Sequence, residues 1–323
     1  MTNEIVEKPV NALPAPLIEA ANKAREYAEA SLSDATRRRY ASAWRGFVEW
    51  CLEHDANPLP AEPELVAAYF AAAEMRPQTL GVVSAAIRLA HTSQGHDDPT
   101  KSEAVRLTLR GIRRTHGVAT HGRRALRLAE LQRILSECGD GFAGQRDAAL
   151  LLVGFVGGMR RAELAAMDWS HLREEPEGLV ITIPRSKTDQ EGEGRTVALP
   201  YGRSLLTCPV RTLHRWRAHV GGIMRTRLVP DPGAVWLSQR SLRRLPASRI
   251  ATVLQDRAEA AGIDTKLLAA HSLRVGFATE AALAGASERA IARQTGHRDV
   301  KTLRKYIRDG TVFSDNAAAK LDL

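Results

Sequence analysis

Cysteine, aromatic residues and long apolar runs are all scarce in this chain of 323 residues. The three cysteines, Cys51, Cys138 and Cys208, lie far apart, which excludes a disulfide framework and a zinc site of closely spaced thiolates. Aromatic residues make up only 5% of the chain, which argues against a platform on which single-stranded bases stack. No run is apolar enough to span a bilayer, and residues 1–4 lack the pattern of a secretory signal. These absences predict a cytoplasmic protein without membrane contact.

Motifs that bind nucleotides or metal ions are missing as well. The sequence contains no Walker-type phosphate loop and no Gly-x-Gly-x-x-Gly turn after a strand. No His/Cys cluster has zinc spacing, and no carboxylate grouping stands out that would hold paired metals. We therefore expect neither a metal nor another cofactor. In a reaction at phosphate, positively charged side chains would have to take the place of a metal.

Basic residues are present in excess, which gives a net charge of +9 and a pI near 9.8. A basic protein attracts any polyanion, so nucleic acid, anionic lipid and acidic partners are all candidates. The stretch from Ala104 to Ala129 holds no acidic residue, although such a run is often only solvated surface. Because aromatic residues are few, a surface that follows the phosphates of duplex DNA fits better. The candidate DNA-binding residues are Arg106, Arg110, Arg113, Arg114, Arg123, Arg124 and Arg127.

The apolar periodicity predicts an all-α domain over residues 31–116. It follows a tail, residues 1–30, which begins with polar residues and prolines and continues with an alanine-rich, helix-compatible stretch. Helices are expected to begin at Ser33 or Asp34, at Pro63, at Pro77, and at Pro99 or Thr100. The apolar face of the first helix comprises Tyr40, Trp44, Phe47, Val48, Cys51 and Leu52.

A short stretch with Gly and Arg, residues 117–124, predicts a linker to a second domain over residues 125–310. Two β-branched runs, 179–183 and 195–199, flank a polar stretch and predict a hairpin with a long tip. Helical periods occupy most of the remainder: 128–137, 144–156, a helix that opens near Arg160, and the chain from Val210 onward. The expected fold class is mainly α, with an all-α N-terminal domain and a mixed α/β C-terminal domain that holds a small antiparallel sheet.

Four segments carry side chains suited to phosphate chemistry, and the first two lie before and within the hairpin. Arg160 opens a helix after a glycine pair, so its guanidinium and the helix N-terminus can face one anion. Glu163 can brace Arg160 from one turn on, while spacing leaves open whether Arg160 or Arg161 points inward. Lys187 follows the first strand and could donate a proton. For each segment alone, an ordinary surface charge is the more common explanation.

The other two segments lie near the C-terminus. His271 and Arg274 stand three residues apart, so on a helix their side chains share a face. Gly296-His297 adds a second imidazole. Tyr306 follows among several cations, whose charge would favour the phenolate, the attacking form. A half-buried tyrosine on an amphipathic helix is the plain alternative.

The order of these groups resembles that of the tyrosine recombinase (phage integrase) family, the Cre-like site-specific recombinases: Arg160-x-x-Glu163, Lys187, His271-x-x-Arg274, Gly296-His297 and Tyr306. The resemblance runs from about residue 128 to the end of the chain. The preceding helical domain matches the family's core-binding domain in size and position. The resemblance also implies a catalytic domain over residues 125–310 and a C-terminal segment, 311–323, that docks on a neighbouring protomer. A helix folded back on its own domain is the plain alternative for this segment.

The resemblance implies a reaction in which Tyr306 attacks a DNA phosphodiester and leaves a 3′-phosphotyrosine and a free 5′-hydroxyl. The other roles would be divided by position: Arg160 and Arg274 hold the non-bridging oxygens, His271 and His297 assist proton transfer and orientation, Lys187 protonates the leaving oxygen, and Glu163 supports the site. The covalent intermediate conserves the bond energy, so the reaction needs no ATP. Arg161 beside Arg160 departs from the usual pattern and leaves the register between them open.

The implied partners are double-stranded DNA with inverted-repeat half-sites and a homotetramer that forms on two DNA sites. Accessory DNA-bending proteins are compatible with this role, and the composition favours a bacterial or phage-encoded, nucleoid-associated protein. Two alternatives stay open. A type IB topoisomerase would relax supercoils by related chemistry, and a non-catalytic DNA-binding protein would need only helices and basic charge.

Overall fold

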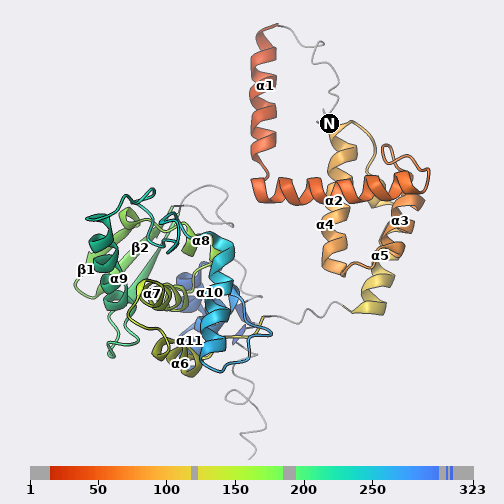
Figure 1. The fold of residues 1–323 in the computed structure, drawn as a ribbon. Helices are drawn as coiled ribbons and strands as arrows, with labels where there is room; N and C mark the ends of the chain where they lie inside the picture. Colours follow the sequence, from red (N-terminus) through yellow and green to blue (C-terminus); the bar gives the residue numbers. More distant parts are fainter. Residues whose placement is uncertain (1–14, 118–122, 185–193, 298–302, 305, 308–323) are drawn as a thin grey trace, which may run out of the picture. The chain divides into compact units, whose positions relative to one another are not determined.

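The computed structural model describes residues 15–117, 123–184, 194–297, 303–304 and 306–307 (Figure 1). The chain divides into two compact units, Met1–Thr120 and His121–Leu323. In the described ranges, no helix is long and apolar enough to cross a membrane.

The first unit is built from helices only, as far as it is described. Proline occupies the first turn of three of its elements, where a missing backbone N–H costs nothing. Ser33 caps the second helix, since its hydroxyl accepts a hydrogen bond from the Thr36 N–H at 3.3 Å. The predicted helix starts at Ser33, Pro63 and Pro77 are confirmed. The elements are α1 (Ala15–Ala30), α2 (Asp34–Glu53), α3 (Pro63–Ala72), α4 (Pro77–Ser93), the 3-10 turn η1 (Pro99–Lys101) and α5 (Glu103–His116).

Two details of this unit differ from the sequence prediction. The last helix is divided, because Ser102 ends η1 and its hydroxyl then caps α5 by accepting from the Val105 N–H at 3.3 Å. Leu52, predicted on the apolar face of α2, is 64% exposed. It follows the buried Cys51 by one residue, and one residue turns the helix by about 100°, which carries the side chain off the buried face.

A buried histidine joins α4 to the loop before α3. His91 is fully buried, its Nε2 accepts a hydrogen bond from the Ala61 N–H at 2.9 Å, and its Nδ1 lies 2.8 Å from the Ile87 carbonyl oxygen. An imidazole that accepts at one nitrogen must be neutral. Burial lowers the pKa of His91, the backbone bond to Ile87 notwithstanding.

The second unit is mainly helical and holds one antiparallel sheet. Its buried helix α7 contacts α9, α10 and α11 (Figure 1). The helical elements are α6 (Leu128–Ser136), α7 (Phe142–Val156), α8 (Arg161–Ala165), the 3-10 turn η2 (Trp169–His171), α9 (Pro209–Met224), α10 (Ala247–Ala260), α11 (Ala270–Leu283) and α12 (Glu288–Thr295). The mainly α fold class with a small antiparallel sheet is confirmed.

The sheet has the order β1-β2-β3, from the strands Leu172–Glu175, Gly178–Ile183 and Arg195–Pro200. In the predicted hairpin, Ile181 of β2 lies opposite Val197 of β3. Val197 and Leu199 are buried while the residues between them are exposed, so β3 packs one face on the core. The sequence prediction missed β1, whose residues lack β-branched side chains.

The chain was predicted to be helical from Val210 onward, and this prediction is wrong for residues 225–246. Residues 225–246 contain turns and isolated bridges, in which Asp168 pairs with Ala234 and Leu237 with Arg244. The segment buries Trp236, whose Nε1 donates to the Leu164 carbonyl oxygen at 2.8 Å. This bond ties the segment to the end of α8, and Pro230, Pro232 and Gly233 within the segment disfavour a helix there.

Candidate active site

The short helix α8 places Arg160 near two other arginines, Arg195 and Arg274. These three residues form a cationic cluster. Arg160 precedes the helix, and its backbone N–H and Nη1 donate to the two carboxylate oxygens of Glu163 at 3.0 and 2.7 Å. Its Nη2 donates to the Gly296 carbonyl oxygen at 2.9 Å, across 136 residues of sequence. Arg161, in contrast, is exposed. The structure therefore resolves the register that spacing left open, with Arg160 as the inward residue.

Arg274, on α11, is more deeply buried than Arg160. It is 1% exposed, and its Nη1 donates to the Gly158 carbonyl oxygen at 2.8 Å and to the Thr295 carbonyl oxygen. These bonds link the turn before α8 to the end of α12. The turn needs glycine, because Gly158 has a φ of +53° and a Cβ there would lie 2.8 Å from the Thr295 side chain. Burial and the neighbouring Arg160 lower the pKa of Arg274 to about 10.

His271 lies one turn before Arg274 on α11 and contacts Tyr306. The His271 Nε2 and Tyr306 Oη atoms are 2.9 Å apart. The segment that carries Tyr306 is anchored by the buried Leu303 and by the Thr279 hydroxyl, which donates to the Tyr306 carbonyl oxygen at 3.3 Å. The residues three apart on α11 thus face one site, as the sequence indicated.

His297 supplies the second imidazole. Its Nδ1 lies 2.7 Å from the Thr295 hydroxyl oxygen, and its ring centroid is 6.2 Å from that of Tyr306. Burial, followed by the charges of Arg274 and Arg160, lowers the pKa of His297 to about 4. The same causes lower the pKa of His271. Both imidazoles are therefore neutral at pH 7, and a neutral ring can accept a proton.

The expectation that nearby cations would favour the phenolate of Tyr306 is confirmed for the Arg274 charge, but the effect of burial is larger. The pKa of Tyr306 is raised, because burial disfavours the charged form by more than the Arg274 charge favours it. The phenol is protonated at neutral pH, so its reaction as a nucleophile requires a group that accepts the proton. His271 is placed to be that group.

The buried Glu163 stays ionised. Burial works to raise the pKa of its carboxyl, but the Arg195 charge and the hydrogen bonds from Arg160 and Arg195 outweigh burial and lower it. Arg195, the first residue of β3, donates from Nη2 to Glu163 Oε2 at 2.7 Å. Arg195 was predicted only as the first residue of a strand. A cation at the base of the predicted hairpin was its sole local signal.

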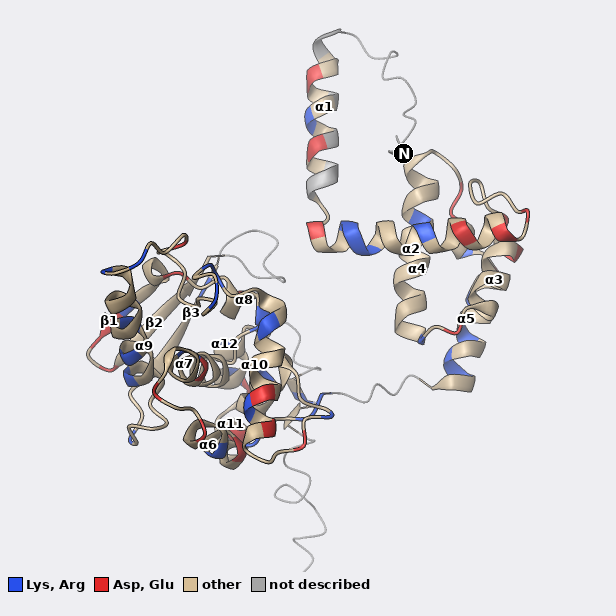
Figure 2. Ribbon diagram, in the orientation of Figure 1, with Lys and Arg blue, Asp and Glu red and all other residues tan. Residues whose placement is uncertain are grey.

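Other predicted residues lie outside this cluster. Lys187 and the segment 311–323 fall outside the described residues. Among the arginines predicted to bind DNA, Arg110, Arg113, Arg114 and Arg123 are exposed, and the last turns of α5 are basic (Figure 2). Arg106 is also exposed and pairs with Glu103 at 2.9 Å.

Two of the predicted DNA-binding arginines are engaged within the second unit. Arg124 donates to both Glu130 carboxylate oxygens at 2.8 Å and to the Asp264 carbonyl oxygen at 2.8 Å. Arg127 pairs with Glu280 at 2.6 Å. The backbone N–H of Arg124 also donates to Leu267, so the predicted linker already joins the second unit at its last residue. We therefore assign Arg124 a packing role, because its guanidinium is partly buried and both of its Nη atoms donate within the second unit.

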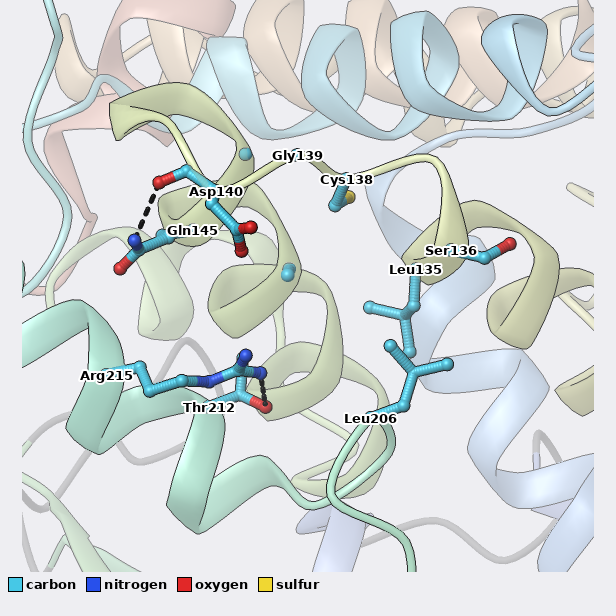
Figure 3. Close-up of a pocket in the computed structure, with 11 residues that line it drawn as sticks. Leu135, Ser136, Cys138, Gly139, Asp140, Gln145, Leu206, Thr212 and Arg215 are labelled. Carbon is cyan, nitrogen blue, oxygen red and sulfur yellow. Dashed lines mark hydrogen bonds between the residues drawn. The ribbon is translucent and has the colours of Figure 1, made fainter.

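A separate pocket lies between the α6–α7 loop, α7 and α9 (Figure 3). It shares no residue with the cationic cluster, and Arg215 is the only cation on its wall. Among the described residues, no group of three or more His, Cys, Asp or Glu side chains is placed to hold a metal ion. The lining residues are Leu135, Ser136, Cys138, Gly139, Asp140, Gly144, Gln145, Ala148, Leu206, Thr212 and Arg215.

Known proteins similar to this chain are recombinases and integrases. Residues 124–311 match the phage integrase family. An integrase/recombinase xerD homolog from Selenomonas ruminantium is 34% identical over 314 residues, which are 93% of this chain and 89% of the relative. Recombinase cre from Escherichia phage P1 is 27% identical over 303 residues, which are 86% of this chain and 85% of the relative.

Solved structures share the fold. A lambda integrase dimer bound to a COC′ core site has a TM-score of 0.61 at 17% identity, and the match covers 92% of this chain and 82% of that chain. The Tn1549 transposon integrase in complex with transposon right end DNA has a TM-score of 0.63 at 15% identity, covering 94% and 98%. The family match spans more than half of the chain, and the Selenomonas ruminantium relative aligns over most of both sequences. The chain therefore belongs to the phage integrase family and is a tyrosine recombinase, an enzyme of site-specific DNA recombination.

Proposed function

We propose that this recombinase cuts and rejoins duplex DNA through a 3′-phosphotyrosine intermediate on Tyr306, without a metal ion or ATP. The observation that carries the proposal is the 2.9 Å distance between Tyr306 Oη and His271 Nε2, within a cluster of guanidinium groups. A protonated phenol next to a neutral imidazole forms a nucleophile and its base. The lowered pKa of His271 keeps that imidazole ready to accept the proton at neutral pH.

The two arginines would bind the scissile phosphate. Arg160 and Arg274 donate to the adjacent carbonyl oxygens of Gly296 and Thr295, which places their guanidinium groups close together. Phosphoryl transfer needs mainly positioning and stabilisation of the charge on the equatorial oxygens. Guanidinium groups suit this task because their planar donors match phosphate geometry and their charge persists at pH 7.

The proton and bond changes balance within the site. Tyr306 Oη bonds to phosphorus as its proton passes to His271, and the bond from phosphorus to the 5′-oxygen breaks. The leaving 5′-oxygen takes a proton from Lys187, while His297 orients the phosphate. Attack by a 5′-hydroxyl of the partner strand reverses these steps and regenerates Tyr306. Because the phosphotyrosine bond conserves the energy of the broken phosphodiester, joining needs no ATP.

The DNA partner would be a duplex with inverted-repeat half-sites, bound by a homotetramer that holds two sites. Support comes from solved structures with the same fold, which include a lambda integrase tetramer bound to a Holliday junction, with a TM-score of 0.56. The exposed arginines of α5 would contact phosphates and set the register of the duplex. Relatives from bacteria and a phage support a bacterial or phage-encoded protein.

The C-terminal segment 311–323 would dock on a neighbouring protomer. We expect deletion of the residues after Gly310 to weaken pairing of two DNA sites more than binding of one site. Gel-shift assays that separate single-site complexes from paired complexes measure both. Equal loss of the two would refute this role.

A covalent-trapping experiment tests the chemistry. The full-length chain first selects its site from random duplex DNA, and a nicked duplex with that site then lets the short 5′-hydroxyl fragment diffuse away after cleavage. We expect a covalent protein–DNA band on a denaturing gel, absent from Tyr306→Phe but unaffected by chelator. A wild-type chain that binds this probe and forms no covalent product would refute the proposal. A plasmid relaxation assay run beside a two-site recombination assay separates recombination from topoisomerase activity.

A further inference from the structure

Arg195 joins three parts of the active site from the base of the β2–β3 hairpin. Its Nη2 donates to Glu163 Oε2 at 2.7 Å, and its Nη1 donates to the Gln294 carbonyl oxygen at 2.8 Å. Its Nε is buried and has no hydrogen-bond partner among the described residues. That face of the guanidinium packs on Gly296, where an added Cβ would lie 2.8 Å from Nε. The side chain is only 15% exposed.

The contact with Glu163 changes the charge available to Arg160. The Glu163 carboxylate contacts both guanidinium groups, Arg160 at 2.7 Å and Arg195 at 2.7 Å. Two guanidinium groups and one carboxylate leave one positive charge, whereas Arg160 and Glu163 alone would cancel. A phosphate gains negative charge on its oxygens as the transition state forms, so a net positive group is needed where Arg160 lies.

The contact with the end of α12 fixes where His297 and Gly296 lie. Gln294, whose carbonyl accepts from Arg195, also donates from its side chain to the Val156 and Ala198 carbonyl oxygens at 3.1 and 2.9 Å. The next carbonyls along the chain, those of Thr295 and Gly296, accept from Arg274 and Arg160. Arg195 therefore braces the same turn of backbone on which both phosphate-binding candidates rest.

We propose that Arg195 is a positioning residue of the recombination reaction. It offsets the Glu163 charge and holds the α12 end, so that Arg160 keeps both a net positive charge and its place at the scissile phosphate. The inference rests on the proposed function, in which Arg160 binds that phosphate. Arginine is required because one planar group serves two acceptors on different elements, and a lysine ammonium retains the charge but not this paired geometry.

The test compares single-turnover cleavage of the nicked selected duplex by full-length variants, with gel-shift affinity for the same duplex measured in parallel. We expect Arg195→Gln to cleave roughly 10- to 100-fold more slowly, because misplacement of a substrate-binding group by about 1 Å can cost about 100-fold in rate, and Arg195→Lys to fall between it and wild type. Affinity for the duplex should change by less than about threefold, because the exposed arginines proposed to contact the other phosphates are unchanged. Arg173→Gln removes an exposed cation from β1 of the same sheet and should cleave like wild type.

A double-variant cycle distinguishes positioning through Glu163 from a general packing role. If Arg195 acts through Glu163, the cleavage defects of Arg195→Gln and Glu163→Gln are not multiplicative. The double variant should then be no more than about threefold slower than the slower single variant.

Several outcomes overturn the proposal. Multiplicative defects, or cleavage by Arg195→Gln at the wild-type rate, would each refute positioning through Glu163. If circular dichroism shows that Arg195→Gln fails to fold, the rate of Arg195→Lys decides, and a wild-type rate there refutes the need for paired geometry. If the wild-type chain itself yields no covalent band, the proposed function is refuted. If the wild-type chain yields the band and Arg195→Gln cleaves equally fast, only the role of Arg195 is refuted.

Discussion

Replacing Gly296 by alanine should damage both the stability of the second unit and its chemistry. Gly296 ends α12 with a φ of +66°, a conformation that costs an alanine about 1–2 kcal/mol. Its new Cβ would also lie 2.8 Å from Arg195 Nε and 2.9 Å from Arg195 Cδ, so the guanidinium must move. Loss of one charged hydrogen bond to Glu163 costs about 1.5–3 kcal/mol more.

Gly285 provides the matched control. It ends α11 with a φ of +84°, and no atom lies within 4 Å of the position of an added Cβ. Gly285→Ala should therefore lower the free energy of unfolding by about 1–2 kcal/mol and leave cleavage of the nicked duplex unchanged. Gly296→Ala should lower it by about 2.5–5 kcal/mol and slow cleavage by about tenfold or more.

Hydrogen exchange of the α7 amides measures the opening free energy of the second unit separately from the first, since α7 lies in the core of the second unit. Cleavage is measured on the nicked selected duplex. The reasoning would be refuted if the two alanine variants lost the same stability and cleaved at the same rate, because the Arg195 contact would then contribute nothing.

Three further predictions concern other parts of the chain. Burial lowers the pKa of His91, so the stability that its neutral form provides is full above about pH 6.5. This stability is lost as the pH falls below that value, at up to about 1.4 kcal/mol per pH unit. Urea unfolding followed by the NMR signals of α4 amides measures the loss, and a free energy of unfolding that stays constant from pH 7 to 5 contradicts the prediction. Lys187→Ala should cleave a normal duplex slowly but cleave a 5′-bridging phosphorothiolate at close to the wild-type rate, because a thiolate leaves without a proton. Equal defects on both substrates would show that Lys187 is not the proton donor. Arg113→Ala should reduce the slope of log affinity against log salt concentration by about 1, because Arg113 is exposed. Arg124→Ala should lower thermal stability instead, because Arg124 is paired with Glu130. Identical effects of the two variants would contradict the assignment of Arg113 to DNA binding and of Arg124 to packing.

The amino-acid sequence by itself determined much of the helical fold and the set of chemical groups. Helix starts at Ser33, Pro63 and Pro77 could be predicted because capping and proline signals act within a few residues. The shared face of His271 and Arg274 followed from helical spacing alone. The order of the polar groups along the chain was sufficient to indicate the family.

Tertiary structure alone decided how these groups work together. The contact of Arg274 with Gly158 spans 116 residues of sequence, and that of Arg195 with Glu163 spans 32. No local pattern reports such contacts, so the contacts of Arg195 could not be predicted, and spacing alone could not decide between Arg160 and Arg161, although the family resemblance favoured Arg160. The raised pKa of Tyr306 has the same origin. Neighbouring cations are visible in the sequence, but the burial that outweighs them exists only after the chain has folded.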